Sequence, residues 1–246
     1  MAHLNLTILR FKKILNIFLS LNYKIYLAFF RYFMSPSYDH YNVIKNTINV
    51  KSFIDVGANK GQFSLLVNSL FPKKSILAFE PIRSEYLIYK QIFENIKNVK
   101  CFNVGLGSKV ETKQLYLTKS KDSSSFFKPS KIQNNLFRNT NVVSTQTVKI
   151  KKLSSFLHRL KKPIFLKIDV QGYELEVLKG ANLTQIQYIY LEGSYVRLYE
   201  NQPIIKDIIK YLSKKNFKLN SEYNLLKNNN KKIQADFLFK NNKITI

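Results

Sequence analysis

Three apolar stretches of the sequence are each followed directly by a carboxylate. The acids are Glu80, Asp169 and Glu192, which follow residues 76–79, 163–168 and 186–191. Runs of this length and composition are typical of buried β-strands. A buried carboxylate is costly unless it has partners, so the repetition indicates a shared site rather than packing. In open α/β sheets, ligands bind at the edge where the carboxyl ends of the strands meet.

A glycine turn lies before the first of these acids. Asp55, Gly57 and Gly61 form the pattern D-x-G-x-x-x-G, between a strand predicted over 51–55 and a helical apolar pattern that begins at Phe63. A strand, glycine turn, helix and second strand open a Rossmann-like sheet, and Gly57 lets the backbone bend sharply and come close to a ligand. A dinucleotide site would need G-x-G-x-x-G, and its second glycine is missing here.

The acids also restrict the ligand. Asp55, just before the turn, would repel a pyrophosphate but suits an ammonium or sulfonium group. Glu80 suits a ribose, because a carboxylate can accept hydrogen bonds from two hydroxyls at once. S-adenosylmethionine (SAM) carries all of these groups and no phosphate. The turn alone would also fit an ordinary β–α–β crossover with a chance acid, and the acids at the other strand ends weigh against that alternative.

Composition and charge allow several kinds of partner. The chain has 246 residues, enough for one α/β domain with an N-terminal appendage, and a formal net charge of +25 that comes mostly from lysine. Our first interpretation of this charge is a biased overall composition, and our second is attraction to an anionic membrane. RNA readers usually rely on arginine and clustered aromatics, whereas arginine is sparse here. The single Cys101 excludes an intramolecular disulfide.

Residues 1–35 are predicted to form a basic amphipathic helical appendage. Their longest uncharged run, residues 14–23, is far shorter than the roughly 20 residues that a membrane span needs. On one helix the polar residues share a narrow face; they are Arg10, Lys13, Ser20, Lys24 and Arg31. Membrane-surface attachment and a packed or oligomeric appendage both remain open. We therefore predict a cytoplasmic protein, with peripheral contact at the inner membrane face as one alternative.

The rest of the chain, residues 36–246, is predicted to be one domain. Residues 113–118 and 142–150 are expected to be strands that could pair, and the polar stretch 119–141 between them is either a functional loop or a surface insertion. The other predicted elements are a strand over 99–104, helices over 39–48, 82–95, 153–160 and 203–214, and a closing hairpin within 217–239.

Five segments in order resemble the FkbM family of SAM-dependent methyltransferases. They are FIDVGANKGQFS, FEPIRSEY, NVGLG, LKIDVQGYELEVLKGA and YLEGSYVRLYENQP, within residues 50–221. The KIDVQGYELEVLKGA block is the most specific of them. The resemblance implies an α/β class I methyltransferase fold: a seven-stranded, mostly parallel Rossmann-like sheet with helices on both faces. It also implies SAM as cofactor and a hydroxyl as methyl acceptor.

The resemblance assigns the cofactor-binding residues. Asp55, Gly57, Asn59 and Gly61 would hold the methionine end of SAM, and Glu80 its ribose. The turn containing Asn103, Gly105 and Gly107 would lie near the adenine. These assignments agree with the preference of the glycine turn and of Glu80 for a sulfonium compound with a free ribose.

Methyl transfer also needs a group that accepts a proton. We predict Asp169 as this base, because it ends the strand next to the glycine turn, with Glu174 and Glu192 as alternatives. Glu174 could equally be a helix N-terminal acid, and Lys167 is expected to point away or to pair with a carboxylate. Asp169 and Glu192 could be two ligands of a divalent metal, but no third is evident, so no metal is predicted.

The predicted reaction is methylation of a hydroxyl on a sugar of a bacterial surface glycan or its lipid-linked precursor. Tyr195, Tyr199 and the stretch 119–141 are candidates to line the acceptor pocket. The alternatives are an RNA 2′-O-methyltransferase and a catalytically inactive partner subunit. The block after the fourth strand, IDVQGY, differs from the Asp/Asn-Pro-Pro-aromatic block of enzymes that methylate DNA amino groups. The oligomeric state is not predicted.

Overall fold

The computed structural model describes residue 31, residues 34–47 and residues 49–244. The predicted appendage over 1–35 therefore lies almost entirely outside the described residues. In the described part of the chain, no helix is long and apolar enough to cross a membrane.

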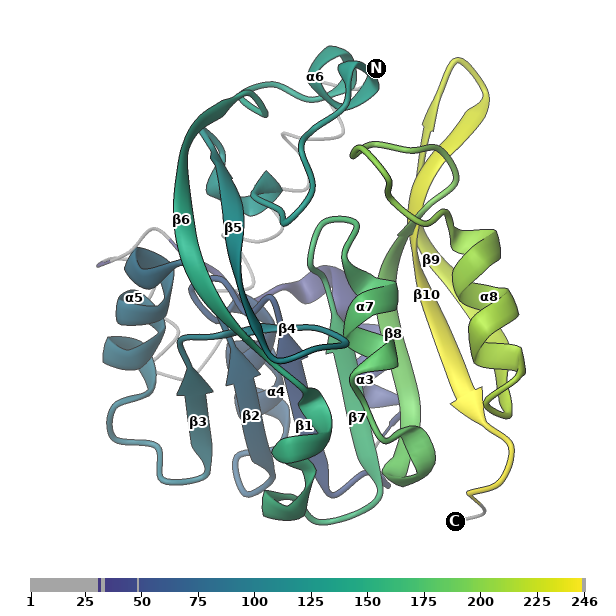
Figure 1. Ribbon diagram of the computed structural model, residues 1–246. Coiled ribbons are helices and arrows are strands. Elements are labelled where there is room, and N and C mark those ends of the chain that lie inside the picture. The colour runs from purple at the N-terminus through teal and green to yellow at the C-terminus, as the bar shows by residue number, and fades with distance from the viewer. Residues whose placement is uncertain (1–30, 32–33, 48, 245–246) are drawn as a thin grey trace.

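A seven-stranded sheet forms the centre of the molecule (Figure 1). Its order is β3 (Val99–Phe102), β2 (Ser75–Phe79), β1 (Ser52–Val56), β7 (Ile164–Ile168), β8 (Ile186–Ser194), β10 (Lys231–Asn241) and β9 (Phe217–Asn228). The first five strands run parallel, and β10 runs antiparallel to both of its neighbours. The order reverses between β1 and β7, which is where such sheets bind ligands. The predicted class I methyltransferase fold is confirmed.

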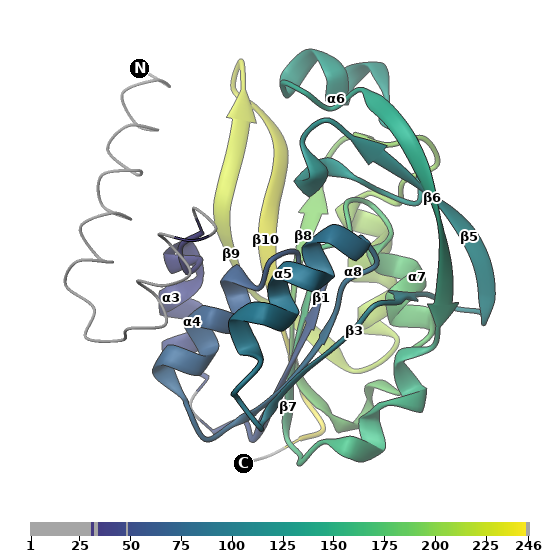
Figure 2. The same cartoon turned by 90° about the vertical axis from the view of Figure 1, so that its left-hand side faces the viewer.

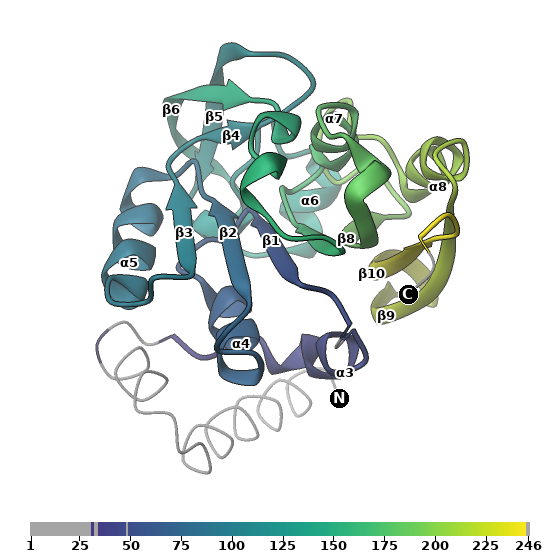
Figure 3. The same cartoon turned by 90° about the horizontal axis from the view of Figure 1, so that it is seen from below.

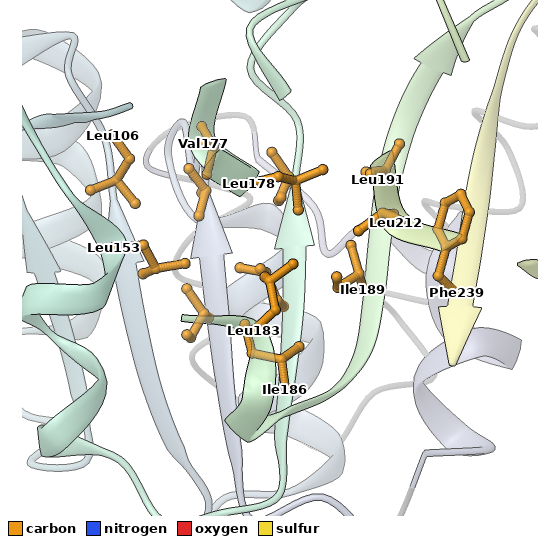
Figure 4. Close-up of a cluster of buried hydrophobic side chains, with 14 of the residues drawn as sticks. Leu106, Leu153, Val177, Leu178, Leu183, Ile186, Ile189, Leu191, Leu212 and Phe239 are labelled. Carbon is orange, nitrogen blue, oxygen red and sulfur yellow. The ribbon is translucent and has the colours of Figure 1, made fainter. Parts of the chain in front are cut away.

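Helices cover both faces of this sheet (Figures 2 and 3). One face carries α3 (Tyr41–Lys45), α4 (Gln62–Leu70) and α5 (Arg83–Phe93), and the other carries α7 (Glu174–Lys179) and α8 (Ile205–Ser213). Alternate strand residues therefore enter different cores: Phe53 and Phe165 pack with α4, whereas Ile54 and Leu166 pack with α7. Burial on both faces explains why these strands read as continuous apolar runs. Figure 4 shows part of the core on the α7 side.

A second sheet stands beside the first at its carboxyl edge. Strands β5 (Glu111–Thr118) and β6 (Val142–Lys151) pair antiparallel, which confirms the predicted pairing, and β4 (Gly105–Leu106) adds a short parallel strand to β6. The stretch between β5 and β6 contains the 3₁₀ turn η2 (Lys121–Ser123) and helix α6 (Lys131–Leu136). We call residues 119–141 the cover segment.

Several predicted boundaries change. The third strand ends at Phe102, because the chain leaves the sheet there to supply β4. Residues 153–160 form two short 3₁₀ turns, η3 (Leu153–Ser155) and η4 (Leu157–Arg159), instead of one helix. Strand β8 continues to Ser194, so Glu192 lies inside the strand, opposite Asp236 of β10, and not after its end. Two further 3₁₀ turns are η5 (Leu183–Gln185), which precedes β8, and η1 (Tyr38–His40), which precedes α3.

Candidate active site

A cleft lies at the carboxyl edge of the central sheet. Its floor is formed by the residues that follow β1, β2 and β7, and the cover segment closes one side with Lys121, Asp122, Ser124 and Phe126. Figure 1 shows the cover segment and the β5–β6 hairpin standing over this edge. The predicted site edge therefore coincides with an actual cavity.

The turn after β1 needs glycine at two positions. Gly57 has a φ of 74°, and a Cβ placed there would lie 1.8 Å from the carbonyl oxygen of Asp169. Gly61 has a φ of 100° and would collide with the rings of Phe93 and Tyr89. Both positions combine a left-handed backbone with a close approach, and only glycine accepts this combination without strain. The result is a narrow turn that brings the backbone of β1 against the loop after β7.

Glu80 faces the cleft at the end of β2. Its Oε2 accepts a hydrogen bond from the backbone N–H of Asn59 at 2.7 Å, and its Oε1 accepts one from the N–H of Ile82, also at 2.7 Å. Burial raises the pKa of Glu80 to about 7, although both N–H groups favour its ionised form. Each oxygen keeps a second lone pair. The carboxylate is thus fixed in position and able to accept hydrogen bonds from a diol.

A polar row crosses the sheet beneath the cleft. Asp55 of β1 is paired in register with Lys167 of β7, which is paired in register with Tyr190 of β8, so these side chains share the face covered by α4. Lys167 Nζ lies 3.4 Å from Asp55 Oδ1 and 3.5 Å from Asp169 Oδ2, and it donates to the Gly57 carbonyl at 3.2 Å. Burial would lower the pKa of Lys167, but the two carboxylates raise it above its ordinary value. Lys167 thus pairs with carboxylates, which is one of its two predicted placements.

Asp55 lies behind the cleft and does not line it. It is completely buried and accepts a hydrogen bond from Ser64 of α4 at 2.7 Å. Burial raises its pKa, while Lys167 opposes the shift. Its visible role is to hold Lys167 and the start of α4, and its predicted contact with the methionine end of SAM stays a prediction.

Of the three acids predicted as proton acceptors, Asp169 is the one that lines the cleft. Its side chain is 38% exposed. Gln171 Nε2 donates to Asp169 Oδ1 at 2.8 Å and to Glu192 Oε2 at 3.0 Å, so one amide joins two of the three acids. That amide separates the two carboxylates that could have shared a metal ion.

Glu174 and Glu192 brace the structure around Asp169 instead of facing the cleft. Glu174 Oε1 accepts hydrogen bonds from the N–H groups of Val170 and Gly172, at 3.2 and 2.9 Å, and burial raises its pKa to about 7. Glu192 accepts a second hydrogen bond from Gln234 at 2.9 Å, and burial raises its pKa well above the ordinary value. Both side chains are placed to position the loop after β7.

The glycines of the NVGLG turn also lie outside the cleft lining. Asn103 Nδ2 donates to the carbonyls of Glu80 and Pro81, at 2.8 and 3.0 Å, and so fixes the backbone beside Glu80. A Cβ on Gly105 would meet Ile150 and Phe126, and the carbonyl of Gly107 lies against Gly180. These contacts join β4 to its surroundings, and the predicted proximity of the turn to the adenine stays a prediction.

The two tyrosines predicted for the acceptor pocket do not line the cleft. Tyr195 is hydrogen-bonded to Glu222 at 2.6 Å, on the surface. Tyr199 is buried, and its hydroxyl lies 2.9 Å from Gln171 Oε1, which turns the Gln171 amide nitrogen toward the acids. Tyr199 thus affects the site indirectly, by orienting Gln171.

Sequence reasoning missed one contribution to the cleft, His40 of η1, which lines it from before the first strand. The stretch 119–141 was a candidate to line the acceptor pocket, and Lys121, Asp122 and Phe126 of this segment do line the cleft. No spacing pattern connects His40 with the motifs, because it belongs to a short 3₁₀ turn far away in the sequence from the strands that it faces.

Comparison with a solved structure gives the fold class of this chain. A crystal structure of methyltransferase FkbM from Methylobacillus flagellatus KT superimposes with a TM-score of 0.53 at 12% identity, covering 83% of this chain and 48% of that chain. This likeness concerns the fold: a class I methyltransferase-like α/β domain.

The family follows from the sequence model of the methyltransferase FkbM domain, which matches residues 55–219. The chain therefore belongs to the FkbM methyltransferase family. Methyltransferase 1 of Beauveria bassiana (strain ARSEF 2860) is 32% identical over 146 residues, covering 52% of this chain and 57% of that protein. Methyltransferase sdnD of Sordaria araneosa is 29% identical over 169 residues, covering 58% and 65%. The chain thus spans between about half and two thirds of the length of these relatives.

The cofactor of this family is SAM, and the cleft suits it. The Gly57 turn leaves a cradle that any side chain would fill. The acids that line the cleft, Glu80, Asp122 and Asp169, suit a cationic ligand with a free ribose. The two lysines of the lining both have carboxylate partners, because Lys167 pairs with Asp55 and Asp169, and Lys121 with Glu85 at 2.8 Å. This set of groups favours a sulfonium compound over a phosphate.

Proposed function

We propose that this chain is an O-methyltransferase that transfers the methyl group of SAM to a hydroxyl of a small polyhydroxylated acceptor. The observation that carries the proposal is Asp169, an exposed carboxylate on the cleft wall that Lys167 and Gln171 hold beside the Gly57 turn. A fixed hydrogen-bond acceptor at this point can align a hydroxyl with a cofactor seated on the turn. Such alignment accounts for roughly 7–11 kcal/mol of the barrier in favourable reactions.

The residues have separate roles in this proposal. The turn containing Gly57, Asn59 and Gly61 holds the methionine end of the cofactor, and Glu80 accepts hydrogen bonds from its ribose. SAM supplies an activated methyl group. Asp169 binds the hydroxyl groups of the acceptor, with Glu174 and Glu192 positioning the loop that carries it.

We propose a sugar as the acceptor. The cleft wall carries several amide and carboxylate groups that can bind neighbouring hydroxyls, among them Gln62, Asp122 and Gln171. Aromatic rings are few there, with Phe63 and Phe126 on the lining. A flat apolar acceptor would find little to stack on, whereas a sugar could satisfy the polar groups. A surface glycan or its lipid-linked precursor is one source of such a sugar.

The charge of the cleft argues against the RNA 2′-O-methyltransferase alternative. The chain carries a formal net charge of +25, but the cleft lining has three carboxylates against two paired lysines. An RNA enzyme draws much of its affinity from phosphate contacts. If RNA were the acceptor, binding should weaken steeply with salt, and a flat salt response would eliminate it.

Peripheral membrane contact through residues 4–34 is part of the same proposal. Its support is the basic amphipathic pattern of those residues. Deletion of residues 1–34 should leave a protein that binds SAM but no longer floats with liposomes of anionic lipid. Unchanged flotation would remove membrane attachment from the proposal and leave the catalytic part intact.

Calorimetric titration with SAM, followed by a screen of methyl glycosides with radiolabelled SAM, tests the proposed function. Wild-type protein should bind SAM, and transfer of label to at least one glycoside should follow. Folded wild-type protein that does not bind SAM would refute the proposal. Binding with label transferred to RNA but not to any glycoside would replace the proposed acceptor.

A further inference from the structure

A chain of hydrogen bonds begins at His40 on the wall of the cleft. His40 Nδ1 lies 2.9 Å from the hydroxyl oxygen of Tyr190, and that hydroxyl donates to Asp236 Oδ2 at 2.9 Å. Asn224 Nδ2 donates to the same carboxylate oxygen at 2.7 Å. Four segments of the chain, η1, β8, β9 and β10, thus contribute to one connected group.

The sheet explains how this group comes to face the cleft. Tyr190 continues the row of Asp55 and Lys167 on the face covered by α4, so its ring is buried, and its hydroxyl contacts His40 at the cleft wall. The His40 ring packs edge-on against Tyr190, with ring centroids 5.3 Å apart, and tilts against Phe63 at 6.0 Å. Its side chain remains 19% exposed and lines the same cleft as Gly57 and Asp169.

The arrangement favours one tautomer of His40 when Asp236 is ionised. An ionised carboxylate accepts hydrogen bonds and cannot donate them, so Tyr190 gives its one proton to Asp236 Oδ2. The Tyr190 oxygen must then accept from His40, so Nδ1 carries the proton. Nε2 is left with a free lone pair. Among the described residues, Nε2 has no hydrogen-bond partner, so it can accept a proton from a ligand.

We propose that His40 is the catalytic base of this enzyme, an inference that rests on the proposed O-methyltransferase function. The acceptor oxygen forms a bond to the methyl carbon as the carbon–sulfur bond breaks with its electron pair left on sulfur. The hydroxyl proton passes to His40 Nε2, and the resulting imidazolium is stabilised through Tyr190 by Asp236. Tyr190 and Asp236 are positioning residues, because they act through His40.

This assignment leaves Asp169 with a different task. Its two oxygens already face Lys167 and Gln171. The carboxylate is thereby held as a hydrogen-bond acceptor for a hydroxyl of the sugar next to the one that reacts. His40 Nε2 has no such contacts to give up.

The charges around His40 favour a base that is neutral near pH 7. Burial lowers its pKa below the ordinary histidine value, and Lys167 lowers it further. The carboxylates of Asp236, Asp169 and Asp39 oppose this shift. Removing the Asp236 charge should therefore lower the pKa of His40 further.

Nitrogen-15 NMR of the imidazole groups tests the proposal without any acceptor. The chain has three histidines, which makes assignment by single substitutions practical. His40 should be the Nδ1–H tautomer, its signals should shift when S-adenosylhomocysteine is added, and Tyr190→Phe should change the tautomer balance. An Nε2–H tautomer that persists in the wild type would overturn the proposal, because that nitrogen could not accept a proton.

Kinetics provide the second test, with the glycoside that the wild type methylates. His40→Gln should lower kcat by about 10²–10⁴-fold, the usual contribution of a general base, and should leave SAM binding unchanged. Asp236→Asn should lower kcat less and move the acid limb of the pH profile to lower pH. His158→Gln is the matched control, because His158 is exposed and remote in η4.

The two failures are distinguishable. If the wild type does not bind SAM, the proposed function falls. If the wild type methylates a glycoside and His40→Gln retains its rate and acid limb, the assignment of His40 falls and the O-methyltransferase function stands. Asp169→Asn would then be the next variant in which to look for a large loss of kcat.

Discussion

The two sides of the cleft are built in different ways. The side we assign to the cofactor consists of turns: the Gly57–Gly61 turn, the end of β2 at Glu80, and Asn103, which fixes the backbone beside it. The side we assign to the acceptor consists of side chains from distant segments, with His40 facing Tyr190 across 150 positions of sequence. Backbone geometry defines the first side, and strand order defines the second. A binding function can thus be encoded locally, whereas this proton-accepting group requires the whole sheet.

Gly57→Ala should have the largest effect, because it distorts the turn on which both sides of the cleft depend. The new methyl group would enter a left-handed position 1.8 Å from the Asp169 carbonyl oxygen. Positive φ alone costs about 1–3 kcal/mol, and the collision adds to it, so we expect severe loss of stability and no SAM binding. Thermal melting and calorimetry measure both.

Gly107→Ala is the control for this substitution. Its Cβ would meet a side chain, Ile150, at 2.9 Å, and its φ lies outside the left-handed region. It should cost less stability than Gly57→Ala. Equal losses of stability would show that the close approach of Gly57 to the Asp169 carbonyl does not make the β1 turn more sensitive to substitution than β4.

Glu80→Gln and His40→Gln should separate the two sides. Hydrogen bonds to charged groups contribute about 1.5–3 kcal/mol, so Glu80→Gln should weaken SAM binding by roughly 10- to 150-fold and should reduce kcat at saturation little. His40→Gln should reduce kcat strongly and leave the affinity for SAM unchanged. Glu94→Gln, at an exposed position, is the control for loss of charge. Parallel losses of affinity and kcat in both variants would contradict a division of the cleft into two sides.

The raised pKa values of Glu80 and Glu174 predict how stability depends on pH. Both are about 7 in the folded protein, against an ordinary value of 4.5. The folded state therefore binds more protons than the unfolded state between these values, and stability should fall as pH rises from about 4.5 to 7. Each carboxyl can contribute on the order of a few kcal/mol.

Chemical unfolding of the SAM-free protein at several pH values measures this slope. Glu174→Gln and Glu80→Gln should each reduce it. The affinity for SAM should change with pH in the opposite direction to stability. It should increase as pH rises through about 7, because the ionised Glu80 carboxylate is the better hydrogen-bond acceptor. A slope that neither substitution changes would show that the two carboxyls ionise normally.

Lys121→Ala should have the smallest effect, and it probes the cover segment that joins the two sides. Lys121 pairs with the buried carboxylate of Glu85 on α5, which also has Ser84 as a partner at 3.0 Å. The Lys121 side chain is about half exposed, so the pair should contribute at most about 1 kcal/mol. We expect near-normal stability but faster hydrogen exchange in residues 119–130. Exchange at the wild-type rate would mean that other contacts hold the segment.

Local patterns were sufficient for much of this fold. Apolar runs followed by acids predicted β2, β7 and β8, and the glycine turn marked the end of β1. Together they placed a site at the carboxyl ends of these strands, and β5 and β6 were expected as strands that could pair. These features depend on side-chain period and on the conformational freedom of glycine, both properties of a few consecutive residues. The same local reasoning was wrong about Glu192, because the length of β8 depends on its partner β10.

Tertiary structure alone decided which polar groups meet. The sequence offered Asp169 as the proton acceptor with Glu174 and Glu192 as alternatives, and the structure shows that Asp169 lines the cleft while the other two hold the loop behind it. The partnership of His40, Tyr190 and Asp236 depends on the order β7–β8–β10 and on a register that puts Tyr190 beside Lys167. A shift of one residue would turn Tyr190 to the opposite face. The sequence by itself determined the turns and the strands, because these are local; the proton-accepting group exists only where distant strands pair in this register.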